Sequence, residues 1–452
     1  DSIASARLEP GGTLEPLRAA VQAALSSDER FLFVHGCRAV RSDEEVAGLG
    51  LEDGAVLLVC FYTPRTVLTA SADGRAKLFD SETGACIRTL EGHEGGILSA
   101  RFSPDAKKAL TTSSDGTARL FDLATGACER SFGGHGSSVN TAALSPSGAL
   151  LLTGTYEGTV RIFDVETGEC RHTLKGERPI VRSLLFLPDG REAVAAAGGQ
   201  VVKMIDTESG TWEATLSGHK QSVRTACLSP DGAKLLTASD DRTAKLWDLA
   251  SAKCEATFEG HARAVCAAAF SPDGSTVATA CDDNTAKVFA AVAPTPPEGL
   301  AVERDAATEQ AAEELFGAAA AEAAPAEAET PSPAPTPALS GRALQTLRGH
   351  SEPLYSVCFS PDGTKVLTAS VDRTARIFDA ETGSCERVLR GHRLPVRMAV
   401  FSPDGQKVLT ASHDRTARIF DASLGVCERT LEGHSQALCF AAFVPDAPEI
   451  AG

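Results

Sequence analysis

The sequence predicts a mainly β protein in which eight equivalent four-stranded units close into one ring. A pattern of Gly-His, then Ser-Pro-Asp-Gly, then Ser-x-Asp-x-Thr-Ala-x-x-aromatic-Asp recurs along the chain. Neighbouring copies are 42 residues apart, as from Phe79 to Phe121, except that one copy carries 47 extra residues. A fixed period of this length indicates a repeat architecture whose units are covered only by their neighbours, so the ring must close.

The aromatic that ends the pattern marks the copies. It falls at Phe79, Phe121, Phe163, Trp247, Phe289, Phe378 and Phe420, and Ile205 takes the slot in a weaker copy.

One copy, from Gly218 to Asp248, predicts the strands of every unit. Residues 223–228 form a first strand, and Ser229-Pro-Asp-Gly232 is a turn because proline presets φ and glycine accepts a positive φ. Residues 234–239 and 243–247 are a second and a third strand, the latter with apolar and polar residues in alternation. A fourth strand follows over 253–258, so each unit is one propeller blade.

Composition excludes several classes of partner. The formal net charge of -17 argues against nucleic acid or an anionic membrane. The longest apolar run, 55–62, is too short to span a bilayer, and no secretory signal is visible. The 13 cysteines form no Cys-x-x-Cys pair, and we expect them to be reduced, small apolar fillers. The cytosol or the nucleus is the expected location.

These copies resemble the WD repeats of the β-propeller superfamily. The resemblance covers residues 64–290 and 342–446, although Trp-Asp itself occurs only at Trp247-Asp248. It implies an eight-bladed propeller over 63–290 and 342–446. It also implies a buried hydrogen-bonded tetrad in each complete copy, formed in the best copy by His219, Ser239, Asp241 and Trp247. Four copies carry Phe, which has no donor, and should form triads instead. The copy from Gly176 to Asp206 departs furthest and is predicted to be the weakest blade.

A hydrolase is the obvious alternative, because each copy holds Ser, His and Asp. A catalytic triad occurs once, however, with an exposed nucleophile and an oxyanion hole, whereas this set recurs in several copies. The sequence has no Walker-type glycine-rich loop and no His/Cys cluster with metal-ligand spacing. We therefore predict no catalytic residue, no cofactor and no metal site.

The first 62 residues do not follow the period. Strands at 5–9, 30–35 and 55–60, with a helix from Thr13 to about Leu25, resemble the ubiquitin-like (β-grasp) fold. The family's first strand is missing, so we expect a truncated domain over 1–62, on a chain that begins at Asp1 without methionine. Phe33 and Val59 match the family's hydrophobic patch, and both are equally consistent with ordinary core residues.

The two ends of the repeat array complement each other. The first copy lacks its Gly-His, whereas Gly433-His434 and residues 437–443 form an unpaired first strand. We expect this C-terminal strand to complete the first blade, with His434 beside Asp73 and Ser71. The alternative is that Pro445 begins a ninth copy of a longer array.

Residues 291–341 interrupt the sixth copy between its third and fourth strands. The segment is rich in Ala, Pro and Glu, and its part 296–341 holds nine acidic residues and one basic residue. We predict disorder, with a transient helix over 308–324. A tolerated surface loop and a regulated docking tail, with Ser332 and Thr336 as phosphosites, are the two interpretations.

The expected function is a non-catalytic protein-interaction scaffold, monomeric within a larger complex. In WD-repeat proteins, partners often meet residues beside the start of the first strand and before the tetrad Asp. The corresponding residues here are Asn140, Tyr156, Arg182, Arg224, Asp240, Asp282, Tyr355, Val371, Arg397 and His413. The arginines suggest acidic or phosphorylated peptides as partners. A target receptor or adaptor in the ubiquitin system is one hypothesis, and a ciliary or cytoskeletal assembly or transport adaptor is the alternative; an enzyme is a third, with no motif to support it.

Overall fold

The computed structural model describes residues 31–35, 38–40, 58–61, 66–176, 180–197, 199–291 and 339–444. Within these ranges no helix has the length and apolar character needed to cross a membrane. The segment 292–338 and the helix expected from Thr13 lie outside them, as does the strand expected at 5–9.

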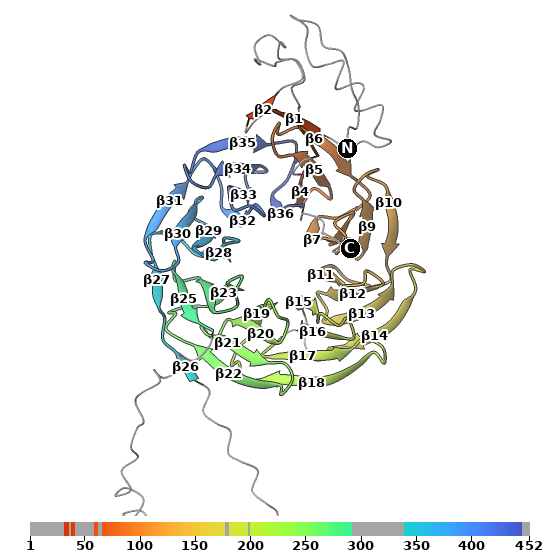
Figure 1. Ribbon diagram of the computed structural model, residues 1–452. Coiled ribbons are helices and arrows are strands. Elements are labelled where there is room, and N and C mark those ends of the chain that lie inside the picture. Colours follow the sequence, from red (N-terminus) through yellow and green to blue (C-terminus); the bar gives the residue numbers. More distant parts are fainter. Residues whose placement is uncertain are drawn as a thin grey trace, which may run out of the picture.

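Eight antiparallel sheets surround a central axis, which confirms the predicted eight-bladed propeller (Figure 1). The first strands lie nearest the axis: β36 (Leu438–Phe443), β7 (Ile97–Phe102), β11 (Val139–Leu144), β15 (Val181–Phe186), β19 (Val223–Leu228), β23 (Val265–Phe270), β28 (Leu354–Phe359) and β32 (Val396–Phe401). We number the blades one to eight in this order.

The other strands of each blade follow outward in chain order. Second strands are β4 (Thr66–Ser71), β8 (Lys108–Ser113), β12 (Leu150–Thr155), β16 (Glu192–Ala197), β20 (Lys234–Ser239), β24 (Thr276–Cys281), β29 (Lys365–Ser370) and β33 (Lys407–Ser412). Third strands are β5 (Ala76–Asp80), β9 (Ala118–Asp122), β13 (Thr159–Asp164), β17 (Val201–Asp206), β21 (Ala244–Asp248), β25 (Ala286–Ala290), β30 (Ala375–Asp379) and β34 (Ala417–Asp421). Fourth strands are β6 (Cys86–Leu90), β10 (Cys128–Phe132), β14 (Cys170–Lys175), β18 (Thr211–Ser217), β22 (Lys253–Phe258), β27 (Gln345–Leu347), β31 (Cys385–Leu389) and β35 (Cys427–Leu431).

Burial within a blade falls from the inner strands to the outer strand. Five of the six residues of β20 are buried on both faces of the sheet, whereas β6 buries only its last residue, Leu90. The core lies between neighbouring blades: Leu246 and Phe258 of blade five pack with Val277 and Phe289 of blade six. Each apolar face is therefore removed from water only by the next blade.

Four cysteines of the fourth strands lie outside this core, whereas Cys254 and Cys427 are partly buried and pack against it. Cys86, Cys128, Cys170 and Cys385 are exposed, and each Sγ contacts the main-chain oxygen two residues further along. The prediction that they are apolar fillers was wrong, because the fourth strand is the outer edge of each blade.

The last strand of the chain closes the ring. β36 pairs antiparallel with β4, with Leu438 opposite Ser71 and Phe443 opposite Val67. The resulting sheet has the order β36-β4-β5-β6, so blade one combines both ends of the repeat array. His434 Nδ1 lies 3.0 Å from Asp73 Oδ2 across this junction. The expected closure and the pairing of His434 with Asp73 are confirmed, but the expected contact with Ser71 is wrong: His434 Nε2 lies 2.9 Å from Thr69 Oγ1, and Ser71 Oγ donates to Gln436 O instead.

A separate three-stranded antiparallel sheet precedes the ring. Its order is β2 (Arg38–Val40), β1 (Phe31–His35) and β3 (Leu58–Phe61). The strands expected near 30–35 and 55–60 are present, and Phe33 is directly opposite Val59. β3 therefore belongs to this sheet and does not supply the first strand of blade one. The ubiquitin-like fold itself stays a prediction, since the rest of residues 1–62 lies outside the described ranges.

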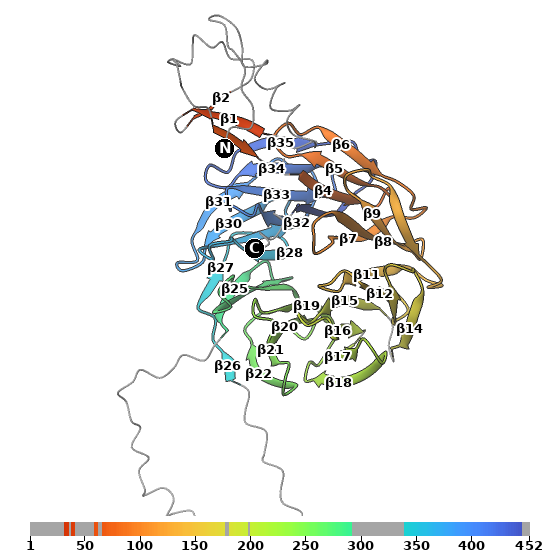
Figure 2. The ribbon, with the colours of Figure 1, turned by 45° about the vertical axis from the view of Figure 1, so that its right-hand side comes forward.

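The return from the insertion adds a strand that the repeat does not predict. β26 (Leu339–Gly341) pairs in parallel with β22, the outer strand of blade five, before the chain enters β27 of blade six (Figure 2). A Cβ on Gly341 would lie 2.7 Å from Phe258 Cδ1, so glycine permits the close approach of β26 to blade five. The chain thus links the outer edges of two blades.

Deleting residues 433–452 removes β36 and should lower the melting temperature of the ring by roughly 10 °C or more. Leu438, Ala441 and Phe443 are buried in the junction, and their loss exposes the faces of blades one and eight. Thermal unfolding followed by circular dichroism measures the effect. Deleting only 445–452 is the control and should leave the melt unchanged; equal melts for both truncations would refute closure by β36.

Candidate protein-interaction face

A buried polar network occupies one end of blade five. His219 Nδ1 lies 2.8 Å from Asp241 Oδ2, and His219 Nε2 lies 2.7 Å from Thr237 Oγ1. Trp247 Nε1 donates to the same Thr237 oxygen at 2.9 Å. The threonine hydroxyl thus accepts from the indole, and its own proton faces His219 Nε2 and, at 3.3 Å, Lys245 O.

The hydroxyl of this tetrad comes from Thr237, and the assignment of Ser239 was wrong. Side chains alternate along β20, so both residues lie on the same face, but only Thr237 pairs with a residue of β21, Lys245, and lies near Trp247. Ser239 acts one step away: its Oγ donates to Gln221 O and accepts from Asp241 N at 3.1 Å each. It therefore positions the aspartate and the loop before β19.

The network recurs in other blades, but with fewer of its four residues. Five other blades hold the His–Asp–Thr set with phenylalanine in the aromatic slot: His434–Asp73–Thr69, His93–Asp115–Thr111, His261–Asp283–Thr279, His350–Asp372–Thr368 and His392–Asp414–Thr410. The expected triads are therefore present, again with threonine. In blade three, His135 Nδ1 lies 2.9 Å from Gly116 O instead of a carboxylate.

The described residues of blade four form no such network. Ala195 and Ile205 occupy the threonine and aromatic slots, and both are buried in the apolar cluster shared with blade three. Four strands nevertheless pair in the usual order. Whether it is the weakest blade stays a prediction, because replacing a buried polar network by packed apolar groups can be neutral in free energy.

The pKa values of several histidines and aspartates in these networks are lowered, the histidines by burial and the aspartates by hydrogen bonds. Burial lowers the pKa of His93, His135, His261, His350 and His434, outweighing the partners that would raise it. Burial alone would raise the pKa of Asp115, but hydrogen bonds from Thr117 and His93 outweigh it and lower the value to about 2. The pair of His93 and Asp115 is therefore a neutral imidazole beside an ionised carboxylate.

The arrangement is structural and offers no nucleophile. His219 and Ser239 are buried, and the same set recurs around the ring with its hydrogen bonds satisfied internally. Within the described ranges, one group has the residue types of a metal site: His261, Cys281 and Asp283. These atoms are committed elsewhere, however, since His261 Nε2 contacts Thr279 and Cys281 Sγ donates to Arg263 O.

The predicted interaction residues lie at the same end of the blades as these networks. Each follows the opening residue of a first strand or precedes the position of the network aspartate, which is Glu157 in blade three, so together they border the central axis. We call this end of the blades the rim face. The structure brings them together in pairs between consecutive blades. Asn140 Nδ2 donates to Val181 O of blade four at 2.8 Å, beside Arg182. Tyr156 is 56% exposed, which leaves its ring available to a partner.

Arg224 is neutralised within the rim face. Its guanidinium forms ion pairs with Asp240 of its own blade and with Asp282 of blade six, the latter at 3.4 Å. It also contacts Cys266 Sγ, which donates to Asp282 Oδ1 at 2.9 Å. Arg224 therefore bridges two blades in this structure, and its role in binding an anionic partner stays a prediction.

Blades seven and eight present a different combination. The Arg397 guanidinium lies over the Tyr355 ring, 5.0 Å from its centroid, and the His413 ring lies 6.2 Å from Tyr355. Burial, and then the charge of Arg397, lower the pKa of His413, so its imidazole is neutral at pH 7. Val371 precedes the network aspartate of blade seven and lies beside Arg373.

Sequence reasoning missed two neighbours of this cluster. Arg393 and Leu394 follow His392 in the loop before β32, and Leu394 is 48% exposed. Arg373 and Arg415 are exposed in the adjacent turns. Among the described residues, none of Arg373, Arg393, Arg397 and Arg415 forms an ion pair. Their signal was present: the loop residues after Gly-His vary between copies, whereas the repeat pattern draws attention to its fixed positions.

Replacing Thr237 by valine should lower the free energy of unfolding by about 2–4 kcal/mol, because Trp247 Nε1 and His219 Nε2 both lose their partner in a buried site. Urea denaturation at pH 7.5 measures the loss. Thr237→Ser keeps the hydroxyl and should cost clearly less. If the two variants were equally stable, the hydroxyl would not hold this network together.

Stability should fall as pH drops from 7.5 to 5.5. The unfolded chain binds protons on histidine below about pH 6.5, whereas burial lowers the pKa of five imidazoles in the folded chain and makes them bind protons less readily, so acid favours unfolding. Below about pH 4, protonation of the unfolded aspartates, such as Asp115, adds to this loss. Urea midpoints in 0.3 M salt, which screens surface charge, give the test; a higher midpoint at pH 5.5 would contradict it.

Comparison with known proteins agrees with this architecture. The family model described as "WD domain, G-beta repeat" matches residues 84–122, 126–164, 210–248, 252–289, 341–379 and 383–421. The unmatched copies are blade four, whose described residues form no such polar network, and blade one, whose strands come from both chain ends.

Two curated relatives match over one repeat length. "Pre-mRNA-processing factor 17" of Homo sapiens is 43% identical over 44 residues, and "THO complex subunit 6" of Arabidopsis thaliana is 44% identical over 46 residues. Each match covers 10% of this chain, and the chain spans only 8% and 12% of those relatives. The matched WD repeats, by contrast, cover just over half of the chain, and the protein therefore belongs to the WD domain, G-beta repeat family.

Proposed function

We propose that the protein is a non-catalytic scaffold that binds partner proteins on the rim face of blades seven and eight. The observation that carries this proposal is the cluster of Tyr355, Arg397 and His413, flanked by the exposed Leu394 and by unpaired arginines. Tyrosine and arginine are the residue types that most often dominate binding energy at interfaces. An exposed leucine beside them supplies apolar contact area.

The chemistry of this cluster favours an acidic or phosphorylated peptide. A guanidinium that has no internal carboxylate partner can form bidentate hydrogen bonds with a carboxylate or phosphate. Arg224 is less suited to this role, because Asp240 and Asp282 already neutralise it. The arginines of blades seven and eight can therefore bind an anion, whereas Arg224 forms ion pairs that link blades five and six.

The cellular pathway in which this scaffold acts is a more specific hypothesis. A role in the ubiquitin system depends on the ubiquitin-like resemblance of residues 1–62, and an assembly or transport adaptor remains the alternative. The relatives named for pre-mRNA processing and for the THO complex match over about one repeat, which is the part that WD-repeat proteins share. The cytosol or nucleus is the proposed location, with partners that include neither nucleic acid nor membrane.

The test is crosslinking mass spectrometry of partners captured from native extract. The baits are the unchanged chain, an Arg393→Glu/Arg397→Glu variant, and a Lys107→Glu/Lys253→Glu control. The control makes the same change in charge at exposed positions near the opposite end of the blades. We expect crosslinks to residues near Tyr355 and Leu394, lost in the rim variant and kept in the control.

Two results would contradict the proposal. Partners that persist with the rim variant would exclude blades seven and eight as the binding surface. Partners lost equally with both charge reversals would indicate a general effect of net charge. Melting curves of all three proteins must coincide before either comparison is made.

A further inference from the structure

A second repeated feature lies at the opposite end of the blades, near the Ser-Pro-Asp-Gly turns. The first residue of the second strand forms an ion pair with the fourth strand in four blades: Lys108–Glu129 at 2.6 Å, Lys234–Glu255 at 2.8 Å, Lys407–Glu428 at 3.1 Å, and Lys365–Glu386. These pairs span the third strand. Each places charged groups over the space between its blade and the next.

Blade six replaces both members of this pair. Thr276 takes the lysine position and Leu344 takes the glutamate position, and Leu344 is 56% exposed. The next position also changes: Arg130 and Arg387 reach main-chain oxygens of the following blade, whereas Gln345 Nε2 donates there to Glu381 O. The substitutions together exchange three charged side chains for two polar ones and an exposed leucine.

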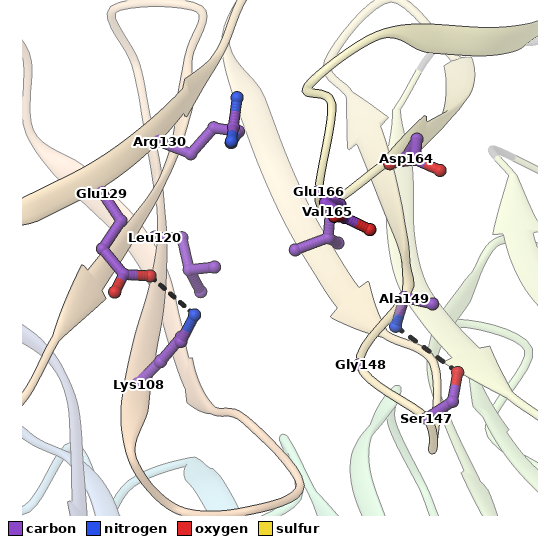
Figure 3. Close-up of a pocket in the computed structure, with 10 residues that line it drawn as sticks. All are labelled: Lys108, Leu120, Glu129, Arg130, Ser147, Gly148, Ala149, Asp164, Val165 and Glu166. Atoms are coloured by element: carbon purple, nitrogen blue, oxygen red, sulfur yellow. Dashed lines mark hydrogen bonds and ion pairs between the residues drawn. The ribbon is translucent and has the colours of Figure 1, made fainter.

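The same groove can be compared at two places in one molecule. Between blades two and three it has a volume of about 630 Å³, and the Lys108–Glu129 ion pair forms one wall opposite Val165 and Glu166 (Figure 3). Between blades six and seven the corresponding groove has a volume of about 790 Å³. Val288, Leu344 and Ala380 line it where the first groove has Leu120, Glu129 and Val165.

The charges around the two grooves also differ. The groove between blades six and seven has three acidic residues, Asp273, Asp362 and Glu381, and no basic residue among those that line it. The groove between blades two and three also has three acidic residues, Glu129, Asp164 and Glu166, but Lys108 and Arg130 line it with them. Hydrogen bonds from Ser271 and Ser275 lower the pKa of Asp273 to about 2, so its carboxylate is charged at neutral pH.

Blade one shows that loss of the ion pair alone does not produce this site. It carries Thr66 and Ile87 in the two slots, and Ile87 is 39% exposed. Arg88 follows Ile87, however, and Lys107 lies in the facing turn of blade two. Within the described ranges, only blade six has both an apolar residue in place of the glutamate and a groove whose charged residues are all acidic.

The third and fourth strands beside the groove are also paired over fewer residues in blade six than in blade seven. In blade seven the third and fourth strands stay paired to Phe378 opposite Cys385, whereas in blade six the pairing of β25 with β27 ends at Val288 opposite Gln345. Among the described residues, no strand pairs with the outer edge of β25 beyond Val288. This geometry suits a peptide in strand conformation more than a compact small molecule.

We propose that the groove between blades six and seven binds an extended peptide of a partner protein in which an apolar side chain is flanked by lysine or arginine. The apolar side chain would pack on Leu344 and Val288, and the basic residues would face Asp273, Asp362 and Glu381. The site is independent of the rim face and has the opposite charge preference. A scaffold with both sites discriminates its partners by sign of charge at the two ends of the ring.

The test measures fluorescence anisotropy of a fluorescein-labelled pool of nine-residue peptides with a central Arg-x-Arg, where x is Leu, Ile, Val, Phe or Met. A second pool has Glu-x-Glu. We expect saturable binding of the arginine pool to the whole chain, and affinity for the glutamate pool lower by about tenfold or more.

Variants then assign the site. Thr276→Lys/Leu344→Glu installs the ion pair that four other blades already hold, so it should fold normally and weaken binding by about tenfold. Glu381→Lys should also weaken binding, whereas Glu166→Lys, the matched change in the groove between blades two and three, should not. Arg393→Glu/Arg397→Glu should leave binding of this pool unchanged. Absence of binding, or equal binding to the ion-pair variant, would overturn the proposal.

Discussion

The structure depends on the burial of each blade face against the next blade. Among the described residues, each hydrophobic cluster of the blades is shared by two neighbouring blades, as Leu246 and Phe258 are with Val277 and Phe289. A linear array of such sheets would leave two apolar faces in water, with a penalty that grows with the exposed area. The pairing of β36 with β4 removes both faces at once, and so the last six-residue strand determines whether the other blades have a complete set of neighbours.

The repeat period carried most of this information. Eight copies with the same spacing define the blades, and the complementary ends of the array define the closure, because a ring of equivalent units has only one way to supply a missing strand. Side-chain roles inside a strand were harder to predict. Ser239 and Thr237 lie on the same face of β20, and both carry hydroxyls, so sequence alternation cannot say which one reaches Trp247. Only the register between β20 and β21 decides it.

The blades could be predicted from what the copies share, whereas the candidate sites lie where one copy differs from the others. Arg224 looked like Arg397 in the sequence, yet Asp240 and Asp282 neutralise the first, while the second lies on Tyr355. Such differences arise from contacts between consecutive blades, which a pattern within one copy does not contain. The same holds for Thr276 and Leu344, whose significance appears only when the ion pair at the equivalent positions of four other blades is seen.

The short strand β26 gives the ring a mechanical property. The chain leaves blade six after Ala291 and returns along the outer edge of blade five through β26, before it re-enters blade six at β27. Tension applied to the chain on the return side would first load the three residue pairs between β26 and β22. These contacts can separate while the four-stranded core of blade five stays intact. β26 would therefore detach from blade five before the pairing of β36 with β4, which closes the ring, is strained.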